Sequence, residues 1–296
     1  MSIKHPVIAV TGSSGAGTTT VKDAFQHIFI REHLTPAVVE GDSFHRYNRQ
    51  EMKAAICNAE KEGRRAPSHF GAEANLFDKI ETLFKTYGET GRGEKRYYLH
   101  NDNEAEEHNK RLGTQLGSGE FTPWEDLEKG TDLLFYEGLH GGATDGEIDV
   151  SQYADLLIGV VPIVNLEWIQ KIHRDTAERG YSEEAIVDTI LRRMRDYVRY
   201  ITPQFSRTHI NFQRVPTVDT SNPFIARDIP TSDESFVVIR FRDPHGVPFP
   251  YYLQMIQGSF MSRPNSIVVP GGKMGFAMEV ILTPIINDMI VKKKKK

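Results

Sequence analysis

The chain has 296 residues and a formal net charge of −4; 39% of its residues are hydrophobic, 10% aromatic and 26% charged. This composition supports one large core or two modest ones and excludes a long disordered chain, and 36 basic against 40 acidic residues give no signal for nucleic-acid binding. A single cysteine, Cys57, excludes an internal disulfide and a cysteine-ligated zinc site. We find no secretory leader and no apolar run of about 18 residues, so we expect a cytoplasmic protein that does not cross a membrane.

Strand-like and helix-like segments alternate along the chain. Apolar, β-branched runs predict strands at residues 6–10, 37–42, 132–136, 155–161, 235–241 and 266–269. Helical spacing of apolar residues predicts helices at 18–31, 165–179 and 182–200, and a final amphipathic helix at 275–291. The alternation is typical of an α/β protein with a mostly parallel sheet flanked by helices, and Pro- and Gly-rich turns among the later strands predict additional antiparallel strands at one edge.

We expect one domain over residues 1–291, because no linker-like segment divides the chain. The polar stretch from Gly88 to Gly130 contains seven glycines, which predicts a long functional loop or lid. Residues 292–296 are five consecutive lysines, which we expect to form a flexible tail.

A glycine-rich segment joins the first expected strand to the first expected helix. Gly12 and Gly17 are separated by four residues, as in a phosphate-binding P-loop, and Thr19 stands where the Ser or Thr of such a loop binds Mg²⁺. Backbone N–H groups of the loop and the helix N-terminus would bind phosphate oxygens. The expected ATP-binding residues are Gly12, Ser13, Ser14, Gly15, Ala16, Gly17, Thr18, Thr19 and Thr20.

Thr18 occupies the position of the usual P-loop lysine, so the strict motif is not met. The residues alone leave two alternatives open, an ordinary Gly-rich turn before a helix and a site that binds nucleotide without turnover. If a γ-phosphate is transferred, a cation from elsewhere in the chain has to meet the developing charge.

Two acids follow expected strands. Asp42 lies at the carboxyl end of the second strand, where open α/β sheets bind ligands, and can accept a proton from a substrate hydroxyl or bind Mg²⁺; a helix N-cap is the structural alternative. Glu137 ends an apolar strand, as a Walker B acid does. His45 and Arg49 follow Asp42 closely and suit a sugar phosphate, with a solvated loop as the alternative.

Basic residues gather on one expected helix. Lys171, Arg174, Asp175 and Arg179 stand at i, i+3, i+4 and i+8 and therefore share a face. Three cations around one acid suit phosphate binding, although a salt-bridged surface helix gives the same pattern. Because Thr18 leaves the P-loop without its usual cation, a phosphate-binding role for these basic residues is favoured over a surface salt bridge. On the next helix, solvent exposure is the favoured interpretation of Arg192, Arg193 and Arg195.

The polar stretch carries Tyr98 and His100, which can close over a substrate. Its residues with loose metal-ligand spacing are His100, Asp102, Glu104 and His108. We argue against a metal site there, because no helix or strand is expected to fix its geometry.

Taken together, these motifs make the chain similar to the proteobacterial type of phosphoribulokinase over roughly residues 6–290. The matching segments are GSSGAGTTT (12–20), EGDSFHR (40–46), LLFYEGLHG (133–141), VVPIVNLEWIQKIHRD (160–175), NFQRVPTVDTSNPF (211–224) and SIVVPGGKM (266–274). The family itself carries threonine at the position of the P-loop lysine, so Thr18 supports the resemblance.

The resemblance implies a P-loop NTPase-like fold and transfer of the ATP γ-phosphate to the 1-hydroxyl of ribulose 5-phosphate, in the Calvin cycle. Asp42 would be the general base, and Lys171 and Arg174 would stabilise the transferring charge. The acids working with Mg²⁺, together with the P-loop hydroxyl, would be Thr19, Glu137 and Asp175. The residues holding the sugar phosphate would be His45, Arg49, Tyr98, His100 and Arg179.

The resemblance also implies regulation and assembly. Bacterial members are activated by NADH and inhibited by AMP, with effector arginines that match Arg31, Arg240 and Arg263, and they form large homo-oligomers, usually octamers. Cys57 alone excludes the cysteine-pair redox switch of the plant type. The alternatives are a uridine-kinase-like kinase of a small molecule and a catalytically silent nucleotide-binding regulator.

Overall fold

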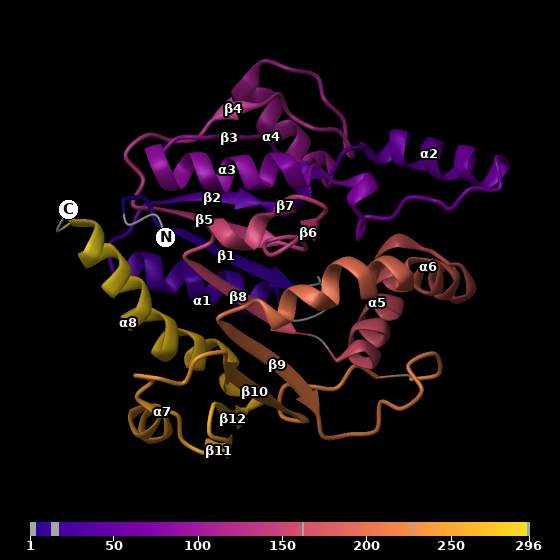
Figure 1. Ribbon diagram of the computed structural model, residues 1–296. Coiled ribbons are helices and arrows are strands. Elements are labelled where there is room, and N and C mark those ends of the chain that lie inside the picture. Colours follow the sequence, from indigo (N-terminus) through magenta and orange to yellow (C-terminus); the bar gives the residue numbers. More distant parts are fainter. Residues whose placement is uncertain (1–3, 13–17, 162, 227, 295–296) are drawn as a thin grey trace.

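One mixed sheet forms the centre of the molecule in the computed structural model, which describes residues 4–12, 18–161, 163–226 and 228–294 (Figure 1). Its strands, in spatial order, are β11 (Phe260–Arg263), β12 (Ser266–Pro270), β10 (Ser235–Phe241), β9 (Ile210–Pro216), β8 (Leu156–Val161), β1 (Val7–Gly12), β5 (Leu133–Gly138) and β2 (Pro36–Glu40). The strands from β9 to β2 run parallel, and β10, β12 and β11 add antiparallel pairs at the other edge. The mostly parallel sheet with an antiparallel addition is therefore confirmed.

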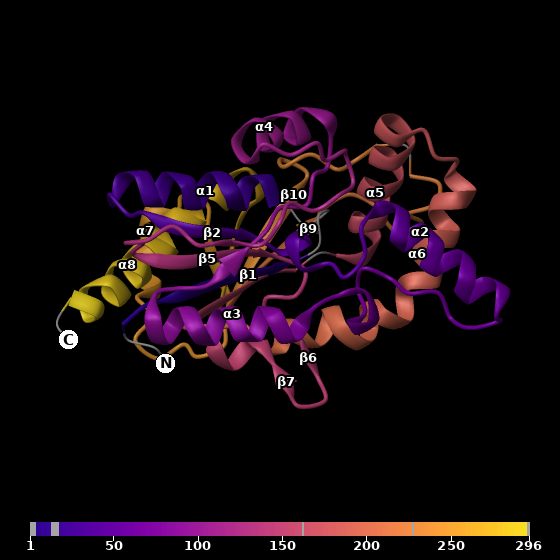
Figure 2. The same ribbon diagram turned by 90° about the horizontal axis from the view of Figure 1, so that it is seen from above.

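Helices cover both faces of this sheet. They are α1 (Thr18–Arg31), α7 (Phe249–Met255) and α8 (Met274–Lys294) on one face and α3 (Phe77–Thr90) on the other. Ile8 and Val10 pack in the layer of α1 and α8, whereas Val7 and Ala9 pack in the layer of α3. Figure 2 shows α1 and α3 on opposite sides of the sheet. Because both faces are covered, β1 is a continuous apolar run rather than an alternating one.

The other helices lie beyond the carboxyl ends of the parallel strands or above the sheet edge (Figure 1). They are α2 (Arg49–Lys61), α4 (Asp102–Leu112), α5 (Val164–Arg179) and α6 (Glu183–Asp196), the last continued by a π-helical turn, Tyr197–Ile201. α5 and α6 share a small apolar cluster, Ile172, Ile186 and Ile190. Ser182 caps α6 by accepting a hydrogen bond from Ala185 N.

The segment predicted as a loop or lid is a small folded unit. α3 extends through Gly88 to Thr90, α4 lies within the segment, and β3 (Glu94–Lys95) pairs with β4 (Glu125–Asp126). Two of the glycines that suggested a loop, Gly91 and Gly113, instead end α3 and α4 in the left-handed conformation at φ +68°. We keep the name lid for residues 91–130.

Two further expectations are corrected. The apolar run at residues 37–42 predicts a buried strand, but β2 is an edge strand with Val38 42% exposed. α8 is apolar on most sides rather than amphipathic, and Gly271–Lys293 is long and apolar enough to cross a membrane by length and composition alone. Its packing is that of a core helix, since Met278, Ile281 and Leu282 are fully buried against the sheet.

The lysine tail is also ordered further than expected. α8 continues to Lys294, so the first three of the five lysines are helical. Lys293 Nζ donates to Asp132 O at 2.7 Å, and Lys292 pairs with Asp288 at 2.5 Å. The Lys293 contact ties the end of α8 to the turn before β5, whereas the Lys292 pair lies within α8. The elements that the sequence did not predict include β11, α3 and α4.

Candidate active site at the carboxyl ends of the parallel strands

Four of the predicted site segments begin where parallel strands end. β1 ends at Gly12, β2 at Glu40, β5 at Gly138 and β8 at Val161. Pairing of β1 with β5 and β8, and of β5 with β2, brings these ends to one edge of the sheet. Side chains from distant parts of the sequence are thereby placed at the position where α/β sheets bind ligands.

The P-loop prediction rests on this placement. Gly12 needs to be glycine, because a Cβ there would lie 2.5 Å from Val160 O. Residues 13–17 and the side chains of Thr18 and Thr19 lie outside the described part of the chain, so their roles stay predictions. Thr20 is described, and a Cβ on Gly275 would lie 3.4 Å from its Cγ2, which places the start of α8 beside the start of α1.

Asp42 lies in a 3₁₀ turn, Gly41–Phe44, which we call the Asp42 turn. Its Oδ1 is 3.3 Å from His45 Nε2 and its Oδ2 is 3.7 Å from His100 Nε2, and the side chain is 42% exposed. Partial burial opposes ionisation, but the hydrogen bond and charge of His45 and the charge of His100 hold the pKa of Asp42 well below its usual range. Asp42 is thus an ionised, accessible acceptor.

His45 is oriented by a second hydrogen bond on its other side. Its Nδ1 lies 2.7 Å from Asn75 Oδ1, while Asn75 Nδ2 donates to the carbonyls of His69 and Gly71. The amide orientation is therefore fixed, and Nδ1 of His45 must carry a proton. Burial opposes protonation, but the bond to Asp42 raises the pKa of His45.

Two more histidines lie behind this pair, and both are kept neutral. The ring of His69 lies 4.4 Å from that of His45, and His140 Nε2 donates to His69 O at 2.9 Å. Burial lowers the pKa of each to about 3. Neither His69 nor His140 was singled out in the sequence, because each lies among apolar or turn residues.

The lid brings the expected sugar-phosphate residues to Asp42. The ring of Tyr98 lies 5.0 Å from His100 and 6.3 Å from His45. Arg49, at the start of α2, donates to His100 O and to Ser118 Oγ, both at 3.0 Å. The structure therefore brings together Asp42, His45, Arg49, Tyr98 and His100.

The basic face of α5 forms as its spacing predicts. Lys171 and Arg174 both pair with Asp175, Arg174 Nε at 3.0 Å, and Asp175 is only 3% exposed. Burial lowers the pKa of Lys171, and the nearby charge of Arg193 adds to the effect. The side chain of Arg179 lies outside the described part of the chain.

Arg193 was assigned to the solvated face of the following helix, and the structure leaves it half-exposed on α6. Its charge is close enough to lower the pKa of both Lys171 and His69. The sequence pattern did not single out this influence on the two groups.

Glu137 is the second-last residue of β5 and lies opposite Glu40 in the register of β2. Burial and the charges of Glu40 and Asp42 raise its pKa to about 7. Clustered carboxylates of this kind fit a hard divalent cation such as Mg²⁺. Among the described residues, however, no group of three or more His, Cys, Asp or Glu side chains has metal-binding geometry, so a joint ligand set with Thr19 and Asp175 stays a prediction.

The loose metal-ligand spacing in the lid falls largely on a helix, which corrects the ground on which we argued against a metal site there. α4 does provide a helical scaffold from Asp102 onward, yet the described residues hold no metal cluster there. The ring of His108 instead lies 4.4 Å from that of Tyr97.

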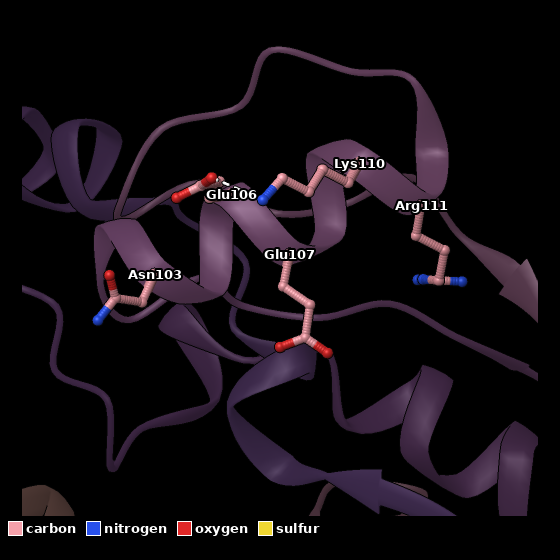
Figure 3. Close-up of a pocket in the computed structure, with 5 residues that line it drawn as sticks. All are labelled: Asn103, Glu106, Glu107, Lys110 and Arg111. Carbon is pink, nitrogen blue, oxygen red and sulfur yellow. Dashed lines mark ion pairs between the residues drawn. The ribbon is translucent and has the colours of Figure 1, made fainter.

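A surface hollow on α4 is separate from these residues (Figure 3). Its lining residues are Asn103, Glu106, Glu107, Lys110 and Arg111. All belong to one helix, and Glu106 pairs with Lys110 at 2.7 Å. It contains none of the predicted site residues.

The expected effector arginines lie elsewhere. Arg240 on β10 and Arg263 on β11 both pair in register with Ser266 of the strand between them. Arg31, at the end of α1, instead pairs with Glu279 at 3.0 Å and donates to Thr283 of α8. Arg240 and Arg263 are therefore neighbours across β12, whereas the described contacts of Arg31 include an ion pair and a hydrogen bond with α8.

A glycine-rich sequence between β1 and α1, an accessible aspartate after β2, an acid near the end of β5 and a basic helix after β8 are together typical of an α/β kinase that transfers phosphate to a hydroxyl group. The model of the "Phosphoribulokinase / Uridine kinase family" matches residues 7–221, and the chain belongs to this family.

Relatives and a solved structure match the chain from end to end. It is 59% identical to "Phosphoribulokinase, plasmid" of Cupriavidus necator, covering 100% of this chain and 99% of the relative, and 60% identical to "Phosphoribulokinase" of Xanthobacter flavus with the same coverage. The solved structure of a phosphoribulokinase from Rhodobacter spheroides matches with a TM-score of 0.89 at 54% identity, covering 99% of each chain.

Proposed function

We propose that this protein is a phosphoribulokinase, which transfers the γ-phosphate of ATP to the 1-hydroxyl of ribulose 5-phosphate and releases ADP, consistent with a role in the Calvin cycle. One observation carries the proposal. An ionised, 42% exposed Asp42 is surrounded by His45, His100, Tyr98 and Arg49, a set of groups suited to an anionic sugar, in a chain that resembles phosphoribulokinases over its full length.

Asp42 would act as the general base. The phosphoryl group passes through a loose transition state, so the hydroxyl loses its proton late and the acceptor mainly has to orient it. A carboxylate with a lowered pKa does this without being protonated near neutral pH. His45, fixed by Asn75, holds the carboxylate in place.

The α5 cluster would meet the charge of the transferring phosphoryl group. Lys171 and Arg174 supply the cations that the P-loop lacks at Thr18, while Asp175 holds them on one face of the helix. Mg²⁺, when bound by Thr19, Glu137 and Asp175, would neutralise the phosphate oxygens. His45, Arg49, Tyr98, His100 and Arg179 would hold the sugar phosphate.

Regulation and assembly follow as finer proposals. NADH would activate the enzyme through Arg31, Arg240 and Arg263, and the protein would act in the cytoplasm as a homo-oligomer, with the octamer as the expected size. The shared partner Ser266 of Arg240 and Arg263 supports an anion site on this edge of the sheet. Arg240→Ala should abolish NADH activation while leaving the basal rate within about twofold; unchanged activation contradicts this assignment.

The decisive experiment is coupled ADP release with Mg-ATP and ribulose 5-phosphate, with uridine as the alternative acceptor and with or without NADH. We expect ADP release that depends on ribulose 5-phosphate. Release with uridine alone would support the uridine-kinase alternative. ATP binding without turnover on either acceptor would support the silent regulator.

A further inference from the structure

Arg96 connects the lid to the Asp42 turn. It follows β3 in the lid, more than fifty positions along the chain from the turn. Its Nε donates to Ser43 O at 2.8 Å and its Nη2 donates to His45 O at 2.6 Å. One planar guanidinium thus binds the carbonyls of two residues that follow Asp42, a geometry that the single ammonium of lysine cannot reproduce.

Aromatic rings of the lid hold this guanidinium in place. Its Cζ lies 3.7 Å from the ring centre of Phe121 and 4.8 Å from that of Trp124. Burial lowers the pKa of Arg96 to about 10, so the group stays charged at neutral pH. The carbonyl dipoles and ring faces offset the cost of burying the charge.

The rings of Phe121 and Trp124 also contact residues on either side of Arg96. Phe121 packs against Tyr98 with ring centres 5.3 Å apart, and Trp124 packs against Phe44 of the Asp42 turn at 5.5 Å. Arg96 is therefore enclosed by groups that contact the turn on one side and the substrate-binding part of the lid on the other.

We propose that Arg96 is a positioning residue: it fixes the Asp42 turn against the lid, so that the general base and the lid's substrate-binding side chains meet the same sugar phosphate in one geometry. The inference rests on the proposed function for its kinetic consequence, but the mechanical coupling of lid and turn does not depend on it.

The chain offers a matched control in Arg111. This arginine also lies in the lid, pairs with Glu125 at 2.7 Å and lies 5.7 Å from the ring centre of Tyr97. Its described contacts are with lid residues and none is with the Asp42 turn. Arg111→Ala therefore removes a stacked, paired lid guanidinium without removing the connection that we propose.

The kinetic test compares Arg96→Ala, Arg96→Lys and Arg111→Ala. We expect kcat to fall about 100-fold in Arg96→Ala, as a misplaced base would cause, with KM for ribulose 5-phosphate raised several-fold and KM for ATP within about twofold. Arg96→Lys should show a smaller loss in the same direction, and Arg111→Ala should stay within about threefold of the parent. Equal effects on both substrates, or parental constants in Arg96→Lys, would overturn the proposal.

A second readout separates this inference from the proposed function. Hydrogen exchange of the backbone amides of residues 41–46 should be faster in Arg96→Lys than in the parent protein, and unchanged in Arg111→Ala. A parent protein that does not phosphorylate ribulose 5-phosphate would refute the proposed function, and the exchange experiment would still decide the coupling. Unchanged exchange in both Arg96 variants would refute the positioning role.

Discussion

Asp42 and Asp175 are both acids at the same end of the sheet, but their surroundings differ. Asp175 is 3% exposed and is neutralised by Lys171 and Arg174 of its own helix, four and one positions before it. Asp42 is 42% exposed and faces two histidines, one of them from the lid. Asp175 is covered and paired on its own helix, so a substrate hydroxyl cannot easily reach it, whereas the exposed carboxylate of Asp42 can contact and orient a hydroxyl. The two residues are of the same type, so it is their surroundings that suit Asp42 to act as the base and Asp175 to hold the cations of α5.

Asp42→Asn should have the largest effect on turnover. It keeps the size of the side chain but removes the proton acceptor, so we expect kcat to fall by about 10² to 10⁴ or more, with KM for ATP nearly unchanged. Steady-state kinetics with both substrates measure this. A loss smaller than about tenfold would mean that the base is another residue.

Lys171→Met tests the cluster of Lys171, Arg174 and Asp175 on α5. Removing a cation that meets phosphoryl charge should lower kcat by about 10² to 10³ while the protein still folds, since the side chain is 22% exposed rather than buried in the core. Thermal unfolding and kcat are the measurements. Arg195→Met is the matched control, because Arg195 is an exposed cation of the neighbouring helix and should tolerate the change. Failure of Lys171→Met to fold would favour a structural role.

Arg49→Ala tests whether the residues around Asp42 bind the sugar phosphate rather than ATP. We expect KM for ribulose 5-phosphate to rise by about tenfold or more, with little change for ATP, because Arg49 joins the lid beside His100. The control is Arg64→Ala, an exposed arginine that pairs only locally with Glu62 at 2.6 Å among its described contacts. Equal changes for both substrates would remove Arg49 from the sugar-phosphate site.

The last prediction concerns stability and pH. Burial lowers the folded-state pKa of His69 and His140 to about 3, below the unfolded value of about 6.5. Between these values the unfolded chain binds more protons, so stability falls as pH decreases, by up to about 1.4 kcal/mol per pH unit for each histidine. Urea unfolding at pH 7 and pH 5 measures the loss.

His140→Gln should reduce this pH dependence, because the variant has one buried histidine fewer to protonate. His245→Gln is the control, since the side chain of His245 is 93% exposed. An unchanged slope between pH 7 and pH 5 in His140→Gln would show that its imidazole is not held neutral by burial.

Local patterns predicted what depends on neighbours in sequence. The spacing of Lys171 and Asp175 predicted that the two share a helix face, where they pair, because residues four apart meet on any α-helix. The alternation of strands and helices along the chain likewise predicted the mostly parallel sheet from local sequence alone. Glycines in the lid predicted a long loop where two of them end helices, because a glycine that ends a helix and a glycine in a loop look alike in sequence.

The amino-acid sequence by itself determined the α/β architecture, the candidate residues at the strand ends and the family. Only the tertiary structure decided which of these candidates share a site. Asn75 reaches His45 and Arg96 reaches the Asp42 turn, each across a long stretch of chain. Such contacts have no periodicity in sequence, because they depend on how whole helices and the lid pack against the sheet.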